Sequence, residues 1–575
     1  MKKYYRNITL GIIATSLIVI SVLLLLSRES EHNGAGFFDG MMGGAGIGVM
    51  GNMMTGRYSE DATFPQDAPA DAPWARPTKV VELKDGDTYE MSAGLVKQEV
   101  GNRVIRRLAY NGMIPGPILK VQKGAHITLK FTNNLPIATT LHSHGLRGDD
   151  DFDGLPTTMG GKQKPMQPGE TFTYELTFPD AGVFWYHPHL REDYTQEMGL
   201  YGNYWVDAPG YWGEVDKEAF LIVDDFSEND PFYKDVTNKS MMGRFGNLLL
   251  INNDTDYTLH AQTGQTVRFF LTNTANTRVF DIALKSPRGE SVPLKVVGGD
   301  IGRVEKEYRT QRLILAPAER IIFETRFTQP GTYTITHRGT PFGMIVVAGA
   351  PTAVRETALR ENSADYAAIR AQMPTLLAKA PDKTLRLTIG MKGMGEMRRG
   401  MRHRTGMGRM MDGTQAAIDA EERRLGGTPR ATQSGDGIVW DDMLGRMNAM
   451  SNTKMMEWYL LDETTGKTNM DITDWTFKKG QLVKVRIFND PDSMHPMQHP
   501  IHFHGQRFVV LASDWGHPGD MRANDNLQWK DTALVRAGET VDLLVDMSNP
   551  GQWMAHCHIA EHLHAGMMLN FRVVE

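Results

Sequence analysis

A chain of 575 residues is too long for one hydrophobic core and predicts roughly three or four domains. Its 41% hydrophobic and 23% charged residues are ordinary for a globular protein, and a net charge of −6 argues against a nucleic-acid partner. The single cysteine excludes an intrachain disulfide, and the 35 methionines are the unusual feature of the composition.

The chain begins with a pattern typical of an export signal or a membrane anchor. Lys2, Lys3 and Arg6 precede an uncharged run, rich in Ile, Leu and Val, at residues 8–26. Nineteen residues can span a bilayer, and no small-residue cleavage site follows, so we expect residues 1–27 to form an uncleaved anchor. The rest of the chain is then expected in the periplasm or on the outer face of the cytoplasmic membrane.

Residues 28–77 are predicted to be a linker. Nine glycines and five methionines lie between Asn33 and Gly56, and such a stretch cannot bury enough apolar surface to become ordered. Two interpretations stay open for it. It is either a plain tether or a segment that attracts copper, because thioethers bind Cu(I).

From residue 78 the chain repeats one pattern three times. Apolar side chains alternate over residues 127–131, 267–271 and 483–487, and this period of two predicts half-buried strands. An asparagine closes each run, and a turn with a glutamate follows later in each copy. The asparagines are Asn133, Asn273 and Asn489, and the glutamates are Glu170, Glu319 and Glu539. The repeat predicts an all-β chain of three antiparallel β-sandwiches.

The expected domain boundaries follow from this repeat. The three domains are predicted at residues 78–208, 209–350 and 383–575, with a linker at 351–382 and a methionine-rich insertion at 390–456. The first and third domains each contain one His-x-His pair in mid-domain and another near the end, whereas the second has lost both pairs and retains His337 alone at these positions. The pairs are His142 with His144, His187 with His189, His502 with His504, and His556 with His558. We expect a metal centre shared by the outer domains, with the second as a spacer and His337 as a structural relic.

The last of these pairs flanks the only cysteine, Cys557, and His562 and Met567 follow it. A thiolate, imidazoles and a weak thioether form the ligand set of blue-copper sites. In a strand, His556 and His558 share one face while Cys557 points to the other, so one strand can serve two metal centres. The alternative is a buried free cysteine among core histidines, which leaves the spacing of the other pairs unexplained.

These motifs resemble those of three-domain bacterial multicopper oxidases, and the resemblance covers residues 78–575. It implies cupredoxin-like Greek-key sandwiches and four copper ions. It also implies one-electron oxidation of a substrate at a type 1 copper, coupled to four-electron reduction of O2 to water at a trinuclear cluster. The implied type 1 ligands are His499, Cys557, His562 and Met567. The implied type 2 ligands are His142 and His502, and the implied type 3 ligands are His144, His187, His189, His504, His556 and His558.

The resemblance also implies proton-relay acids. Asp153 ends an acidic run and matches an acid near the type 2 copper of the family, and the rest of that run is expected to be a turn. Relatives often place a second acid directly after the histidine equivalent to His562. This chain has Leu563 there, and either Glu561 or His564 is the expected substitute.

The insertion carries two groups of methionines. Seven lie between residues 391 and 411, where Gly and Arg separate them and prevent an apolar face. The helical spacing of Met443, Met447 and Met450 instead predicts core packing. Thioethers favour Cu(I), although five arginines in the first group should repel a cation.

A methionine-rich insertion resembles the cuprous oxidases of bacterial copper tolerance. In those enzymes an acid and a methionine ahead of the histidine equivalent to His499 hold the substrate copper. Met497 matches that methionine, and His495 stands where the acid is expected, with Met494 beside it. The implied substrate site is therefore Met494, His495 and Met497.

Three functions remain in competition. The first is a cuprous oxidase in copper tolerance, the second is a laccase-type oxidase of phenols, and the third is a non-enzymatic copper-binding envelope scaffold. The complete ligand set argues against the scaffold. The expected partners are O2, Cu(I) or a phenolic reductant, and a membrane through the N-terminal segment, with the chain as a monomer.

Overall fold

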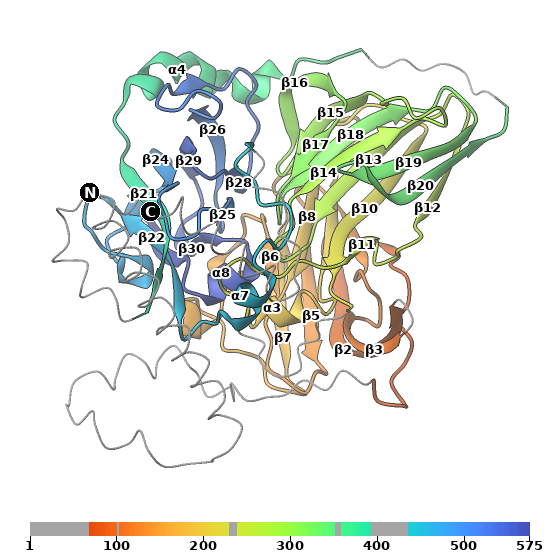
Figure 1. Cartoon of the computed structure of the whole chain (residues 1–575), viewed down its shortest axis with the longest axis horizontal. Coiled ribbons are helices and arrows are strands. Elements are labelled where there is room, and N and C mark those ends of the chain that lie inside the picture. Colours follow the sequence, from red (N-terminus) through yellow and green to blue (C-terminus); the bar gives the residue numbers. More distant parts are fainter. Residues whose placement is uncertain (1–67, 101–102, 229–237, 351–357, 393–434) are drawn as a thin grey trace, which may run out of the picture. The chain divides into compact units, whose positions relative to one another are not determined.

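The computed structural model describes residues 68–100, 103–228, 238–350, 358–392 and 435–575, all within one compact unit, Ser59–Glu575. Its strands form six sheets that pair into three sandwiches along the chain (Figure 1). The prediction of an all-β fold with three cupredoxin-like domains is confirmed. The predicted anchor, residues 28–67 of the predicted linker and residues 393–434 of the predicted insertion lie outside the described residues.

The first sandwich pairs a four-stranded sheet with a five-stranded sheet. Its strands are β1 Val80–Glu82, β2 Thr88–Val100, β3 Arg103–Tyr110, β4 Ile118–Gln122, β5 His126–Asn133, β6 His142–His144, β7 Thr171–Thr177, β8 Gly182–His187 and β9 Gly202–Asp207. The sheet orders are β3-β2-β5-β7 and β1-β4-β9-β8-β6. On β5, Ile127, Leu129 and Phe131 are fully buried, as their alternation predicts.

The second sandwich pairs a six-stranded sheet with a five-stranded sheet. Its strands are β10 Lys217–Phe226, β11 Leu248–Ile251, β12 Thr258–Gln262, β13 Thr266–Asn273, β14 Phe280–Lys285, β15 Leu294–Gly299, β16 Arg303–Thr310, β17 Leu313–Leu315, β18 Arg320–Arg326, β19 Gly331–His337 and β20 Thr340–Ala348. The sheet orders are β11-β10-β13-β18-β15-β16 and β12-β20-β19-β14-β17. The predicted half-buried strand, β13, is buried on both faces, because Phe270 packs against Val183 and Trp205 of the first sandwich.

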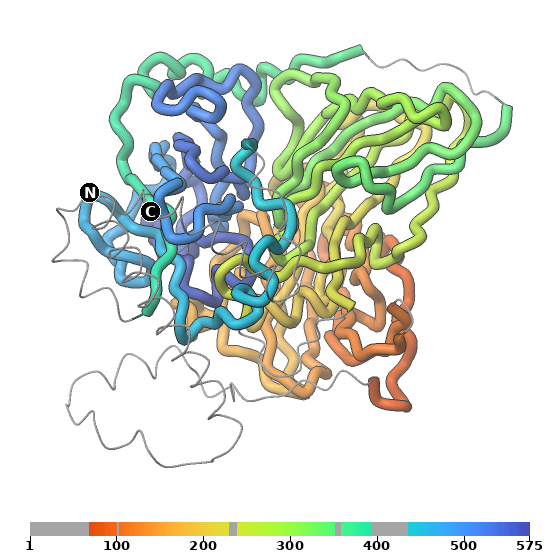
Figure 2. The backbone as a smooth tube through the Cα atoms, viewed as in Figure 1, coloured from red at the N-terminus to blue at the C-terminus, as the bar shows by residue number. Residues whose placement is uncertain are grey.

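The third sandwich has the same arrangement as the second. Its strands are β21 Lys383–Met391, β22 Met456–Asp462, β23 Thr476–Lys478, β24 Gln481–Asn489, β25 His499–Phe503, β26 Arg507–Ser513, β27 Arg522–Ala523, β28 Thr532–Val535, β29 Thr540–Met547, β30 Gly551–Cys557 and β31 Met568–Val574. The sheet orders are β22-β21-β24-β29-β26-β27 and β23-β31-β30-β25-β28. Figure 2 follows the chain through the three sandwiches from orange to blue.

The repeated asparagines have one structural role. The side-chain amide of Asn133 donates to the carbonyls of Ile137 and Met166. Asn273 donates to two carbonyls of the second sandwich and Asn489 to two of the third. Buried carbonyls need such donors, so the residue that closes each predicted strand ties the following loop to the sheet.

In the part of the chain that the structure describes, the helices are short and lie in the connections. They are the 3-10 helices η1 Asp150–Phe152, η2 Thr157–Met159, η3 Ser363–Tyr366 and η4 Asn469–Asp471, and the α-helices α3 Glu192–Thr195, α4 Ala367–Ala378, α7 Gly445–Met450 and α8 Ala560–His564. Among the helices of the described residues, none has the length and apolarity needed to cross a membrane.

Candidate metal centre

Strand pairing brings the four His-x-His motifs together in two groups. In the first sandwich β6 pairs with β8, and His142 lies opposite His187. In the third, β25 pairs with β30, and His502 lies opposite His556. Each sandwich therefore presents its two motifs from neighbouring strands of one sheet.

The two groups interleave to form one cluster. The ring of His142 stacks on that of His504 with centroids 4.1 Å apart, and the ring of His144 stacks on that of His502 at 3.7 Å. His189 lies 5.3 Å from His556, centroid to centroid. The eight histidines of the four His-x-His motifs thus form one buried cluster, which a metal centre shared between these domains requires.

In most of these rings a hydrogen-bond acceptor lies beside Nδ1. The carbonyl of Asp153 lies 2.6 Å from Nδ1 of His142, and that of Asp531 lies 2.8 Å from Nδ1 of His502. Backbone carbonyls likewise occupy Nδ1 of His187 and of His556, both at 2.9 Å. Since carbonyl oxygens only accept, these nitrogens carry the hydrogen and Nε2 keeps its lone pair for a metal.

His144 differs, because its contact with an acceptor is made through Nε2 and not through Nδ1. Its Nε2 lies 3.0 Å from Asp531 Oδ1, and within the described residues its Nδ1 has no hydrogen-bond partner. The same absence, within those residues, holds for Nε2 of His142, His187, His502 and His558. Buried polar atoms without partners cost stability unless something binds them. Several inward-facing imidazole lone pairs suit copper.

The second candidate centre lies on the other side of β30. Cys557 Sγ is 3.5 Å from His499 Nδ1 and 3.8 Å from His562 Nδ1. All three residues are fully buried, as is Met567, whose carbonyl accepts a hydrogen bond from the Cys557 amide. A thiolate with two imidazole nitrogens matches the equatorial ligands of a blue-copper site.

Burial decides the protonation of both centres. Desolvation lowers the pKa of His144, His187, His502, His556 and His562 well below the ordinary value. It lowers the pKa of His504 and His558 to about 3, so these imidazoles are neutral and able to bind a metal. Burial also raises the pKa of the Cys557 thiol, which a bound cation would counteract.

Three buried carboxylates contact the histidine cluster. Asp153 Oδ2 lies 2.9 Å from His504 Nδ1, and Glu192 Oε1 lies 2.7 Å from His189 Nδ1. Asp531 contacts His144, as described above. Burial opposes ionisation of Asp153, but its interactions with His504 and His142, hydrogen bonds included, hold its pKa far below the usual range. Such carboxylates fix the tautomer and orientation of metal-binding histidines.

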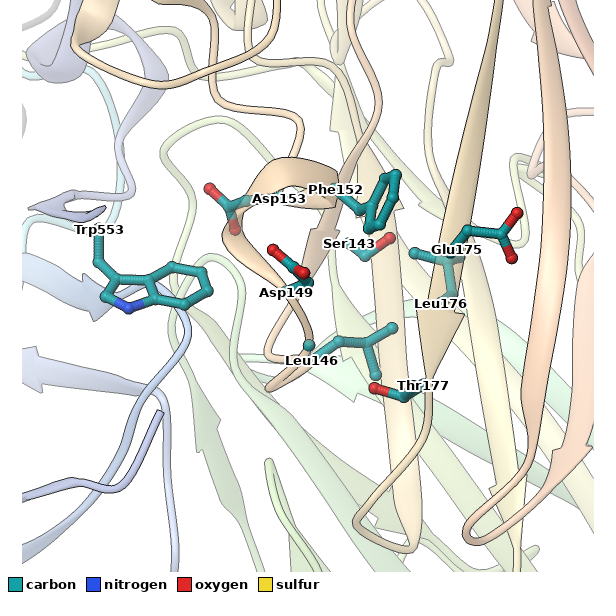
Figure 3. Close-up of a pocket in the computed structure, with 10 residues that line it drawn as sticks. Ser143, Leu146, Asp149, Phe152, Asp153, Glu175, Leu176, Thr177 and Trp553 are labelled. Atoms are coloured by element: carbon teal, nitrogen blue, oxygen red, sulfur yellow. The ribbon is translucent and has the colours of Figure 1, made fainter. Parts of the chain in front are cut away.

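Asp153 also borders a small cavity. A cavity of about 20 Å³, enough for a water molecule, is lined by Ser143, Asp149, Asp153 and Trp553, among others (Figure 3). A larger hollow of about 710 Å³ shares Gly148, Asp149 and Thr177 with it. The two hollows therefore adjoin along the acidic turn, whose predicted form is confirmed by η1.

The two candidates for the second relay acid differ in position. Glu561 contacts Asn276, Thr277 and Arg244 of the second sandwich. His564 Nε2 instead lies 3.0 Å from Glu192 Oε2, and Glu192 in turn contacts the His189 ring. Asp193 and Glu192 raise the pKa of His564 to about 10. His564 therefore contacts the cluster through an acid that sequence reasoning did not identify.

The three predicted substrate-copper residues differ in exposure. Met494 is 39% exposed, His495 is 8% exposed and Met497 is fully buried in the third core. In the second methionine group, α7 begins after Met443, and Met447 and Met450 are exposed. The prediction of a buried methionine stripe is wrong, because Asn448 is the residue that α7 buries.

A loop of the second sandwich covers the cysteine centre. Met241, Met242 and Phe245 pack in the third core with Cys557 and Trp458. The Trp458 indole stacks 4.2 Å from His562 and donates to the Ser240 carbonyl at 2.9 Å. Sequence reasoning missed this loop because nothing in its pattern separates it from any other connection.

Sequence reasoning also missed Glu192, Asp531 and Arg320. Glu192 follows the His187–His189 motif by three residues, which is the one signal that could have indicated it. Asp531 and Arg320 are far from every histidine motif in sequence, and only the packing of the sandwiches brings them to the cluster.

The fold and the two buried ligand clusters together define the class of protein. Three cupredoxin sandwiches with buried histidine clusters shared by the outer two make a copper-binding oxidoreductase. Two family profiles, both described as Multicopper oxidase, match residues 97–210 and 441–575. The chain belongs to the multicopper oxidase family and is an enzyme that uses O2, so the scaffold alternative is set aside.

Similar proteins agree with this assignment. Multicopper oxidase MmcO of Mycobacterium tuberculosis is 27% identical over 489 residues, which cover 82% of this chain and 83% of MmcO. Multicopper oxidase mco of Staphylococcus epidermidis is 25% identical over 82% of this chain and 85% of its own. Among solved structures, a multicopper oxidase of Campylobacter jejuni described as a metallo-oxidase has a TM-score of 0.58 at 20% identity, covering 89% of this chain and 99% of that chain.

Proposed function

We propose that this oxidase is a cuprous oxidase, which takes electrons from Cu(I) at a type 1 site and reduces O2 at a trinuclear site. Four Cu(I), one O2 and four protons would give four Cu(II) and two waters. The observation that carries the proposal is the combination of fully buried cysteine-centre ligands with exposed thioethers in the same domain, at Met447, Met450 and Met494.

The proposed ligands are those that the family resemblance implies. His499, Cys557, His562 and Met567 would hold the type 1 copper, and His142 and His502 the type 2 copper. The type 3 pair would be held by His144, His187, His189, His504, His556 and His558. Four copper ions, when bound, supply the electron storage for a four-electron reduction of O2 to water. Cys557 lies between two type 3 ligands, so a short covalent path joins the two centres.

Asp153 is proposed as a proton relay. Its Oδ2 accepts a hydrogen bond from His504 Nδ1, and its side chain borders the cavity of Figure 3. Positioned acids of this kind act at hydrogen-bond distance from a group or through one water. The cavity offers room for that water beside the carboxylate.

Cu(I) is proposed as the substrate because of what surrounds His499 and His562. Both rings are fully buried, so a bulky phenol has no direct contact with either ligand in this conformation. Methionine sulfur is a soft ligand that prefers Cu(I) to hard ions. Met494 is the exposed group of the proposed substrate site, and the other two residues, His495 and Met497, are buried. A match of 28% identity over 153 residues, 26% of this chain, to Copper resistance protein A of Pseudomonas syringae supports a role in copper tolerance.

The proposed location is outside the cytoplasm. Residues 8–26 are the basis of this proposal, and they lie outside the described residues. We propose that they anchor a monomer to the outer face of the cytoplasmic membrane, where copper and O2 both reach the enzyme.

The test compares two substrates on two proteins. Replacement of residues 391–411 by a Gly/Ser segment of equal length should lower O2 uptake with Cu(I) much more than O2 uptake with a phenol. Equal loss of both activities would contradict the proposal. High phenol turnover by the unaltered chain without added copper would favour the laccase-type alternative.

A further inference from the structure

Arg320 is a fully buried cation at the junction of the three sandwiches. It is the first residue of β18 in the second sandwich, the one without a His-x-His pair. Its Nε donates to the Val183 carbonyl on β8, and its terminal nitrogens donate to the carbonyls of Ala318 and Asp300. The same two nitrogens donate to the two carboxylate oxygens of Asp531. All five N–H groups of the guanidinium are therefore used.

Asp531 is the group that this arginine holds. Arg320 Nη1 lies 2.7 Å from Asp531 Oδ1, and the Thr532 hydroxyl donates to the same oxygen at 2.9 Å. His144 Nε2 lies 3.0 Å from it, and the main-chain carbonyl of Asp531 accepts from His502 Nδ1. One residue thus contacts two adjacent rings of the histidine cluster, through its carboxylate and through its carbonyl.

A carboxylate beside Arg320 accepts hydrogen bonds and donates none, so it selects the Nε2–H form of His144. That form leaves the Nδ1 lone pair facing the cluster. We propose that Arg320 is a positioning residue that holds the Asp531 carboxylate against His144 Nε2 and thereby presents Nδ1 of His144 to the trinuclear copper site. This inference rests on the proposed copper site.

The space beside Gly145 is a second observation that supports the inference. A Cβ atom at this position would lie 2.3 Å from Asp531 Oδ2 and 2.9 Å from Arg320 Nη2, and the residue has a φ of +84°. The glycine after the first His-x-His pair therefore leaves the space that the buried ion pair fills. A side chain there would displace the carboxylate that contacts His144.

Lysine cannot replace the arginine at this site. An ammonium group has three donors and no planar fork, so it cannot hold both oxygens of Asp531 and also reach the Val183 carbonyl of the first sandwich and two carbonyls of the second. Loss of partners that orient metal-binding histidines typically lowers metal affinity about 10- to 100-fold. The same loss is expected from Arg320→Lys, at the trinuclear site and not at the cysteine centre.

The experiment pairs Arg320→Lys with a matched control, Arg268→Lys. Arg268 is also buried in the second sandwich, and its guanidinium donates to the Glu324 carboxylate and to the carbonyls of Trp212 and Gly213, none of which belongs to a histidine. Both variants should melt at a lower temperature in copper-free form. Only Arg320→Lys should lose copper from the trinuclear site in a chelator titration, with a changed type 2 paramagnetic resonance signal and an unchanged blue absorption.

The possible results distinguish a failure of this inference from a failure of the proposed function on which it rests. If the full-length wild-type protein binds no coupled copper cluster, the proposed function fails. If the wild type binds it and Arg320→Lys binds it with the same affinity and the same type 2 signal as Arg268→Lys, the positioning role is overturned. Should Arg320→Lys not fold, Asp531→Asn, which keeps the side-chain volume, is measured in the same way. Wild-type copper affinity and type 2 signal in that variant would overturn the inference equally.

Discussion

His504 Nε2 and His556 Nε2 lie 3.1 Å apart, although each ring already has an acceptor at Nδ1. The acceptors are the Asp153 carboxylate and the Cys557 carbonyl, so both Nδ1 atoms carry hydrogens and both Nε2 atoms bear lone pairs. Two lone pairs that face each other inside a protein repel. A cation between them removes this repulsion, and in the multicopper oxidase family that cation is copper.

Copper removal is therefore expected to destabilise the enzyme. Copper binds the folded state through ligands from two sandwiches, so it should raise the free energy of unfolding by about 4 kcal/mol at a thousandfold excess over Kd. Calorimetry of the copper-free and reloaded protein measures the change. Equal melting temperatures for the two forms would contradict a copper site that joins the outer sandwiches.

Asp153→Asn should lower turnover by about 100- to 10,000-fold, because a positioned acid near the cluster would be lost. The blue absorption should stay, since the Asp153 carboxylate contacts His142 and His504, and neither belongs to the cysteine centre. O2 uptake under saturating reductant measures the effect. Asp151→Asn is the control, since Asp151 is an exposed acid of the same turn, and equal activities of both variants would rule out the relay.

Asn448→Ala should destabilise the cover of the cysteine centre. The Asn448 side chain accepts from the Met242 amide at 3.0 Å and donates to the Gly243 carbonyl at 2.8 Å. Two buried backbone groups without partners cost about 2–6 kcal/mol in the free energy of unfolding. Denaturant unfolding measures it. Met450→Ala, on the exposed face of α7, should change that free energy by less than about 0.5 kcal/mol.

His337 should make stability depend on pH. Its Nδ1 accepts from the Asp281 amide at 3.1 Å, and burial, with Arg278, lowers its pKa to about 4 from 6.5. The unfolded chain binds a proton near pH 6.5 and the folded chain does not. The contribution of His337 to the free energy of unfolding is therefore complete above pH 6.5. It declines by up to about 3 kcal/mol as the pH falls to 4.

The measurement compares the copper-free wild type with His337→Gln at pH 7.5 and pH 4.5. The variant should lose less stability between these values, because glutamine does not titrate. An identical loss in both proteins would show that this histidine has no part in the acid sensitivity of the fold.

Much of the fold could be read from local pattern. Alternation in β5, β13 and β24 reports which face of a strand is buried, because strand side chains alternate at every residue. The pattern failed for β13, which is buried on both faces, and for Met443–Met450, where a buried Asn448 replaces the expected methionine stripe. In both cases contact with another sandwich decided burial, and no local period encodes such a contact.

The sequence by itself determined the chemistry: a lone cysteine between two histidines, paired histidines in the first and third repeats, and none in the second. Cysteine and histidine side chains have an affinity for copper that does not depend on their position in the chain. Only the tertiary structure decided how the rings are oriented. The nitrogen that His144 presents depends on Asp531 and Arg320, and the nitrogen that His504 presents depends on Asp153. Strand packing brings these three residues from distant parts of the chain. Hydrogen bonds act over about 3 Å and are independent of sequence separation, so this selection has no signature along the chain.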